Sequence, residues 1–243
     1  MAAYTNLLDI FNKPLNCRHL GCSRGSTCPV SFASLFLPSC LALETTVPAT
    51  FVFWDSLVDA DNNNYIRTIA KANFRPYGID FPGGGSTGRF YNGRTIIDII
   101  GEEMGLKDYI SPYLAPTTVG DVVLRGVNYA SGGDGILNDT GAIYGTIIMD
   151  AQLDNFASTR DYIISTAYVN DSSMASSKNL LGKAVFFVLM GPNDFIVNYF
   201  SPVPSIPKMT ISPQMFVDLM VSIFKPCKMN CPFLGYFALY TYL

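Results

Sequence analysis

Residues 51–65, "FVFWDSLVDADNNNY", begin as an apolar run and turn polar at Asp55 and Ser56. An aromatic and β-branched run of this kind, ended by a polar turn, is typical of a buried strand in a parallel sheet. A serine at the end of such a strand is where α/β hydrolases hold their nucleophile. The stretch therefore leaves three interpretations of Ser56: a catalytic nucleophile, the remnant of one, or an ordinary loop serine.

The composition indicates a folded globular protein. The chain has 243 residues, of which 49% are hydrophobic and 14% charged. This length predicts one domain of roughly 180–200 residues plus ends. A net charge of −3 argues against a nucleic-acid partner, which usually meets a basic surface. No apolar run reaches the ~18–20 residues of a transmembrane helix, so we expect no membrane span.

The cysteines mark the two ends of the chain as different from its middle. Four lie within the first 40 residues and two near the end, and residues 41–226 contain none: Cys17, Cys22, Cys28, Cys40, Cys227 and Cys231. Cys17, His19, Cys22 and Cys28 are metal-ligand types, but they lack paired C-x2-C spacing. We therefore favour incidental or disulfide-capable cysteines over a zinc site.

The N-terminal region resembles a displaced secretion signal. Residues 30–43, "VSFASLFLPSCLAL", form a short apolar stretch that ends in small residues, as in a signal peptide and its cleavage zone. We therefore expect residues 1–29 to be an atypical N-terminal extension and the protein to be secreted. Asn138 and Asn170 begin the sequons "NDT" and "NDS", which are candidate N-glycosylation sites in a secreted protein.

The order of predicted elements indicates an α/β fold. Strands are expected at 49–56, at the start of 125–137 and within 183–195, and helices at 62–72, 95–105, 149–166 and 212–224. Ser212 and Pro213 are a favourable N-cap and first helical residue for the last of these helices. Strands that alternate with helices predict a parallel sheet with helices packed against it.

Three of the predicted strands end in polar turns that should meet. The turns are Asp55-Ser56, Ser131-Gly132-Gly133 and Gly191-Pro192-Asn193-Asp194. The carboxyl ends of parallel strands line one crevice, so a hydroxyl, glycine N–H groups and an amide would converge there. These are the parts of a nucleophile and an oxyanion hole. The run Gly83–Gly85 lacks the Lys-Ser/Thr of a phosphate loop, so we do not expect one.

Several further stretches carry a family resemblance. "PYGIDFPGGGSTGRFYNGRTIIDII", "YLAP", "LRGVNYASGGDGIL", "DAQLDNFASTR" and "GPNDFIVNYF", with the opening stretch, resemble the plant-type GDSL esterase/lipases of the SGNH hydrolase superfamily. The resemblance covers roughly residues 44–224. It implies a flavodoxin-like three-layer α/β/α parallel sheet of the SGNH hydrolase type, here incomplete at the C-terminus. It also implies hydrolysis of carboxylic esters or lipids by a serine nucleophile.

The resemblance assigns roles to single residues. Ser56 falls at the nucleophile position, and the oxyanion donors would be its own N–H, a glycine of the pair 132–133 and the amide of Asn193. Gly133 is the preferred member of the pair. The expected partner is a small-molecule ester or lipid, with no metal and no organic cofactor.

The chain departs from the family pattern at three positions in these motifs. Trp54 and Asp61 stand where the family usually has glycine, and Asp134 where it usually has alanine. Trp54 would restrict the backbone if that position needs a close backbone approach or a glycine conformation. The Asp134 carboxylate would repel a developing oxyanion if its side chain points into the site.

The largest departure from the family pattern concerns the general base that would activate Ser56. The family carries an Asp-x-x-His pair near its C-terminus, whereas residues 226–243 contain no Asp, Glu or His. We expect residues 225–243 to be a non-family tail that does not complete the sheet. His19 lies far upstream and Lys183 at the opposite end of a strand, so neither is a good substitute. We therefore expect impaired hydrolysis; the alternatives are a non-catalytic acyl- or glycan-binding pseudoenzyme and a truncated product without function.

Overall fold

The computed structural model describes residues 47–142, 144–169, 174–189, 191–200, 211–224 and 236–240. All of these belong to one unit, Thr46–Leu243. The extension 1–29, the signal-like stretch 30–43, His19, Asn170 and the six cysteines lie outside the described residues.

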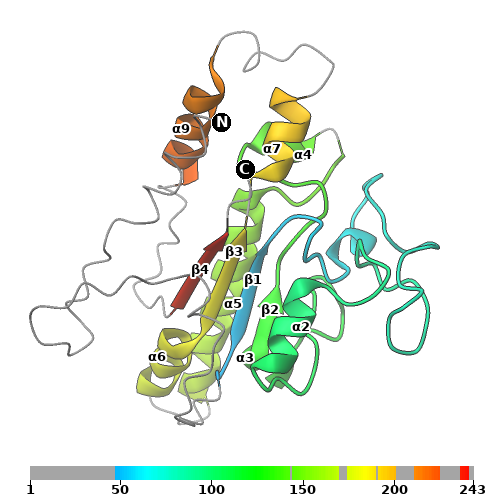
Figure 1. Ribbon diagram of the computed structural model, residues 1–243. Helices are drawn as coiled ribbons and strands as arrows, with labels where there is room; N and C mark the ends of the chain where they lie inside the picture. The colour runs from blue at the N-terminus through cyan, green and yellow to red at the C-terminus, as the bar shows by residue number, and fades with distance from the viewer. Residues whose placement is uncertain are drawn as a thin grey trace, which may run out of the picture. The chain divides into compact units, whose positions relative to one another are not determined.

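A four-stranded parallel sheet forms the centre of the fold (Figure 1). Its strands are β1 (Thr50–Trp54), β2 (Gly126–Asn128), β3 (Val185–Leu189) and β4 (Tyr236–Tyr240), in the order β2-β1-β3-β4. Thr50 aligns with Gly126 on one side and with Val185 on the other. The predicted strands at 49–56, 125–137 and 183–195 are thus confirmed, and their carboxyl ends lie at one edge of the sheet.

The helices follow local sequence signals. They are α2 (Ile96–Glu103), α3 (Asp121–Arg125), α4 (Asn138–Ala142), α5 (Met149–Val169), α6 (Met174–Lys183), α7 (Pro192–Asp194) and α9 (Pro213–Phe224). Thr95 and Asp98 form a capping box at the start of α2, and the Ser212 hydroxyl accepts the Met215 N–H at the start of α9. In the described part of the chain, no helix is both long enough and apolar enough to cross a bilayer.

The helix predicted over 62–72 is largely wrong. Only Asn62–Tyr65 form a helical turn, the 3-10 helix η2. The Lys71 ammonium donates to the carbonyl oxygen of Ile66 at 2.7 Å, and the Ala70 N–H donates to the Thr68 hydroxyl at 3.0 Å. In a continuing α-helix the Ala70 N–H would donate to the Ile66 carbonyl. Here each of these groups is bonded to a side chain instead, so the helix does not continue.

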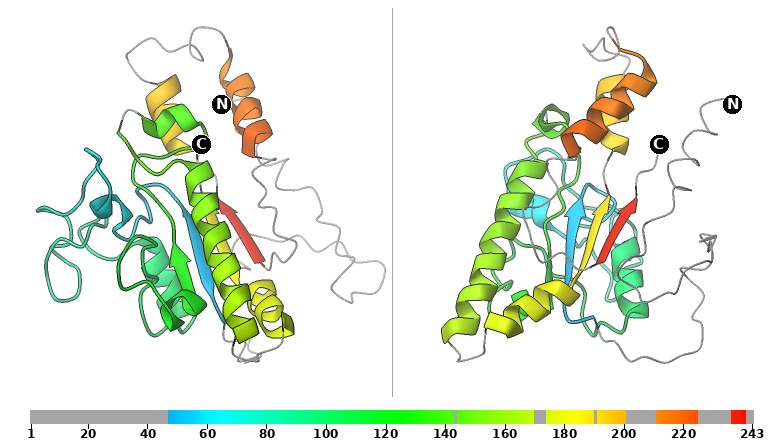
Figure 2. Two further views of the ribbon diagram at one scale, coloured as in Figure 1. Left: turned by 180° about the vertical axis from the view of Figure 1, so that it is seen from behind. Right: turned by 90° about the vertical axis from the view of Figure 1, so that its left-hand side faces the viewer.

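Side chains alternate along the strands and build two cores. Phe51, Phe53 and Phe186 pack with Phe156 of α5 on one face of the sheet, together with other members of the first core cluster. Val52 and Phe187 pack with Ile97 of α2 on the other face. Figure 2 shows α5 and α2 on opposite sides of the strands. This is the expected three-layer arrangement, because a strand buried on both faces needs cover on each.

The tail contributes one strand to the sheet, where the sequence predicted no strand–turn–helix unit that could complete it. Residues 236–240 pair in parallel with β3, from Val185 opposite Tyr236 to Leu189 opposite Tyr240. The segment "YFALY" is rich in aromatic residues, which favour strands. The outer edge of β3 would otherwise present unpaired N–H and C=O groups, which attract a strand.

Candidate functional site

The side chain of Asn193 links the three turns that follow β1, β2 and β3. Its Nδ2 donates to Oδ2 of Asp55 at 3.2 Å and to the backbone oxygen of Asp134 at 2.7 Å. Asp55 is the residue before Ser56, and Asp134 is the residue after Gly133. The structure therefore brings the neighbourhoods of Ser56, Gly133 and Asn193 together at the carboxyl edge of the sheet, as expected for parallel strands.

Ser56 is half-buried in a tight turn that Asp55 organises. The carboxylate of Asp55 accepts the Leu57 N–H at 2.9 Å, and its backbone oxygen accepts the N–H groups of Val58 and Asp59. These bonds fix the backbone on both sides of Ser56. Neither the N–H nor the hydroxyl of Ser56 has an assigned partner among the described residues, so both are available to a ligand.

Of the two basic residues weighed as partners of Ser56, Lys183 is the one that the described residues include, and it does not reach Ser56. The described residues contain no histidine, because His19 lies outside them. Lys183 is exposed at the end of α6, where the chain enters β3, and Ser56 follows the carboxyl end of β1. Lys183 and Ser56 thus lie at opposite ends of the parallel sheet, as predicted.

Trp54 occupies an ordinary strand position. It is the last residue of β1, pairs with Leu189, and does not have a positive φ. The φ of this residue does not require glycine, so the conformational restriction considered for Trp54 does not arise.

Asp61, by contrast, has a glycine-type conformation. Its φ of 137° is the one positive value among the described non-glycine residues. Its carboxylate accepts a hydrogen bond from Asn64, and burial raises its pKa. Asp61 therefore places backbone strain beside residues 55–60, the segment that carries Ser56 and that we call the nucleophile loop.

Asp134 does not direct its carboxyl group at Asn193. Its Oδ2 accepts from the Gln152 amide on α5 at 3.0 Å, and its Oδ1 lies near Gly141 of α4. Within the described residues Oδ1 has no hydrogen-bond partner. Burial, reinforced by the nearby charge of Asp194, raises the pKa of Asp134 to about 8. A carboxyl group that is mostly protonated at pH 7 adds little of the repulsion expected from Asp134.

Asp194 joins the turn after β3 to the segment that follows β2. Its carboxylate accepts the N–H groups of Ile136 at 2.8 Å and Leu137 at 2.9 Å, and the hydroxyl of Thr140 at 2.6 Å. Burial raises its pKa, while these three donors act in the opposite direction. Asp194 therefore holds these two segments together, and it is not a candidate for the general base that would activate Ser56.

The same contacts bear on the sequon at Asn138. Asn138 is exposed at the start of α4, and its Nδ2 donates to Asp150. The Thr140 hydroxyl of the sequon is fully buried. Attachment of a glycan at Asn138 therefore stays a prediction, and it would have to precede folding of this segment.

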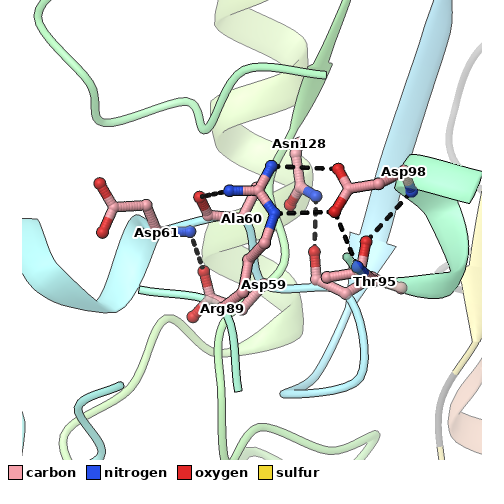
Figure 3. A network of polar contacts seen from close by, with 8 residues as sticks. Asp59, Ala60, Asp61, Arg89, Thr95, Asp98 and Asn128 are labelled. Atoms are coloured by element: carbon pink, nitrogen blue, oxygen red, sulfur yellow. Dashed lines mark hydrogen bonds and ion pairs between the residues drawn. The ribbon is translucent and has the colours of Figure 1, made fainter. Parts of the chain in front are cut away.

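A buried ion pair between Arg89 and Asp98, which the sequence did not suggest, is hydrogen-bonded to the nucleophile loop (Figure 3). Arg89 meets Asp98 with two bonds of 2.7 and 3.0 Å and donates to the Ala60 oxygen at 3.4 Å. Asn128 at the end of β2 donates to the Val58 oxygen at 2.7 Å. The capping pattern Thr95-x-x-Asp98 is visible in the sequence, but nothing in it points to Arg89 as the partner.

Comparisons with known proteins agree on one family. A family model described as GDSL-like Lipase/Acylhydrolase matches residues 51–227. The chain is 53% identical over 192 residues to GDSL esterase/lipase At4g16230 of Arabidopsis thaliana, covering 78% of this chain and 50% of that protein. It is 46% identical over 186 residues to GDSL esterase/lipase At3g50400 of the same plant, covering 74% and 48%. The chain thus spans about half the length of these curated relatives. No solved structure matches it.

Proposed function

The chain belongs to the GDSL-like lipase/acylhydrolase family, and we propose that it acts on carboxylic esters or lipids with Ser56 as the nucleophile. The single observation that carries this proposal is the position of the Asn193 amide. It contacts Asp55 beside Ser56 and Asp134 beside Gly133, so a nucleophile and its oxyanion donors can share one substrate carbonyl.

In the proposed reaction the Ser56 hydroxyl oxygen attacks the ester carbonyl carbon and gives its proton to water as the C=O π bond opens onto the oxygen. The carbonyl oxygen gains negative charge and accepts hydrogen bonds from the N–H groups of Ser56 and Gly133 and from the Asn193 amide. Donors of this kind contribute about 3–4 kcal/mol each to the barrier reduction. Both Nδ2 hydrogens of Asn193 already have acceptors. The oxyanion would replace the longer contact, which is the one to Asp55. Collapse of the tetrahedral intermediate breaks the bond to the alkoxy group, which leaves as the alcohol after taking up a proton, and water then hydrolyses the acyl-Ser56 ester to the carboxylic acid.

Activation of Ser56 is the step for which the described residues offer no group. A general base typically contributes about 10²–10⁴-fold in rate. The resemblance places this role on an Asp-x-x-His pair that residues 226–243 lack. We propose that the 243-residue chain turns over esters slowly, and that Ser56 is a hydrolase nucleophile by descent.

A second candidate is a non-catalytic acyl- or glycan-binding protein that keeps the crevice. The absence of a histidine from the described residues favours it over fast catalysis. Binding of a phosphonate ester without any ester turnover would support this candidate.

The test is hydrolysis of p-nitrophenyl butyrate by the chain, by Ser56→Ala, and by the chain with a relative's Asp-x-x-His segment appended. We expect slow hydrolysis that Ser56→Ala abolishes and that the appended segment accelerates about 10²–10⁴-fold. Ser158→Ala on the exposed side of α5 is the control and should have no effect. Equal rates with and without the segment would contradict the proposed impairment, and unchanged hydrolysis in Ser56→Ala would contradict the nucleophile.

We further propose that the protein is secreted and that its partner is a small-molecule ester or lipid. The signal-like stretch 30–43 and the exposed sequon asparagine Asn138 support secretion. Sequencing the N-terminus of the mature protein tests it: a start within or just after 30–43 is expected, and a start at Met1 would contradict it.

A further inference from the structure

The turn after β2 offers two glycine N–H groups, and one of them is already occupied. The Gly132 N–H donates to Oδ2 of Asp59 at 3.0 Å, and Asp59 is fully buried. Gly133 has a φ of 92°, and its N–H has no assigned acceptor among the described residues. Gly133 rather than Gly132 is thus the member of the pair that is free to donate to a ligand.

The direction of the Gly133 N–H depends on Asn63. The Nδ2 of Asn63 donates to the carbonyl of Gly132 at 2.9 Å. This carbonyl and the Gly133 N–H belong to one peptide unit, which is trans. In a trans peptide the C=O and the N–H point in opposite directions. By holding the carbonyl, Asn63 turns the Gly133 N–H away from itself.

The Asn63 side chain is buried and hydrogen-bonded through both its oxygen and its nitrogen, so its position is fixed. It is 1% exposed, its Oδ1 accepts the Ser131 hydroxyl at 2.5 Å, and its Nδ2 also donates to the Ala70 oxygen at 2.9 Å. On Gly132, a Cβ would lie 2.3 Å from the Phe90 ring. The turn is therefore confined between Phe90 and Asn63 and cannot rotate freely.

We infer that Asn63 is a positioning residue that aims the Gly133 N–H at the substrate oxygen. The inference rests on the proposed function and adds to it. The nucleophile segment supplies Ser56 and, seven residues later, the amide that orients an oxyanion donor 70 residues further along the chain. A misdirected donor lowers the rate of the chemical step, because it stabilises the transition state less than a well-placed one.

The neighbouring Asn62 is a matched control. It is also fully buried, donates to the oxygens of Asn128 and Ala130 at 2.8 and 2.9 Å, and accepts the Leu114 N–H at 3.1 Å. It has no hydrogen bond to Ser131, Gly132 or Gly133. Asn62→Ala should therefore disturb the fold about as much as Asn63→Ala without releasing the Gly132 carbonyl.

The experiment compares both variants by NMR and by kinetics on the full 243-residue chain. In isotope-labelled protein, Asn63→Ala should shift the carbonyl resonance of Gly132 and the amide resonance of Gly133, and Asn62→Ala should leave both unchanged. With p-nitrophenyl butyrate, Asn63→Ala should lower kcat about 10–100-fold with little change in KM. Asn62→Ala should keep kcat within about threefold, because it leaves the Gly133 N–H in place.

The two readouts separate the inference from the proposed function. If the parent chain shows no ester hydrolysis, the proposed function fails, and the Gly133 resonance still tests the positioning. Unchanged Gly132 and Gly133 resonances in Asn63→Ala, or an equal loss of kcat in both variants, would overturn the inference. If Asn63→Ala does not fold, Asn63→Asp retains the shape and the acceptor for Ser131 but removes the amide hydrogens. It should shift the same two resonances, and unchanged resonances there would overturn the inference as well.

Discussion

Replacing Asp61 by glycine and by alanine should reverse the usual order of stability of these two residues. At an ordinary position glycine is less stable than alanine by roughly 0.5–1 kcal/mol, because the unfolded glycine chain has more freedom to lose. Asp61 has φ 137° and ψ −1°, a region that side chains with a Cβ rarely adopt. We expect Asp61→Gly to be more stable than Asp61→Ala.

The magnitude follows from the strain at this backbone conformation. A non-glycine residue held there costs of order 1–3 kcal/mol. Glycine's entropic cost of about 0.5–1 kcal/mol is subtracted, which leaves a net advantage over alanine of roughly 0–2.5 kcal/mol, with a central value of about 1 kcal/mol. Both variants lose the Asn64 hydrogen bond to the Asp61 carboxylate equally, so that term cancels in the comparison. Against the parent chain the same loss offsets much of the gain for glycine.

The assay is urea unfolding with fitted slopes, which gives the free energy of unfolding of each variant. Asp108 is the matched control, since it is exposed and does not have a positive φ. There, alanine should be the more stable replacement. If Asp61→Ala is as stable as Asp61→Gly or more so, the strain assigned to this loop does not exist.

Two further predictions concern buried charge. Arg89→Ala should cost about 3–5 kcal/mol of unfolding free energy, because it leaves Asp98 buried without its partner. Arg94→Ala should change it by less than about 1 kcal/mol, since its pair with Glu102 is exposed, and similar losses in both would contradict the account. Burial raises the pKa of Asp59 to about 7 and that of Asp134 to about 8. The folded state therefore keeps protons that the unfolded state releases, and these groups make stability fall as pH rises from about 4 to about 8. Tm measured across this range should fall less steeply for Asp134→Ala, and an identical slope would refute the assignment.

Local patterns in the sequence were sufficient to predict most of the sheet and its main helices. The apolar runs at β1 and β3 and the cap at Ser212 each determine an element through contacts within a few residues. The convergence of the three turns followed from one topological rule about parallel strands. The prediction of a helix over 62–72 was wrong because the Lys71 ammonium binds the Ile66 carbonyl. Hydrophobic periodicity does not reveal such a side-chain contact.

The supports of the candidate site could not be predicted for a related reason. Gly132 donates its N–H to Asp59 and accepts a hydrogen bond from Asn63, and these bonds join residues 73 and 69 positions apart. Arg89 comes from a glycine-rich loop, and the path of such a loop cannot be predicted from short-range sequence patterns. Such contacts depend on how the loops pack over the strand ends, whereas Ser56 could be proposed from its strand and from the family resemblance of the segment around it.

The central claim is that Ser56 is the nucleophile of this site and that it lacks activation in the 243-residue chain. Its most direct test is the rate and position of labelling by a fluorophosphonate, mapped by peptide mass spectrometry. We predict label on Ser56 alone, about 10²–10⁴-fold faster when an Asp-x-x-His segment from a relative is appended, and none in Ser56→Ala. Label on another residue, or equal labelling of Ser56→Ala, would contradict the claim.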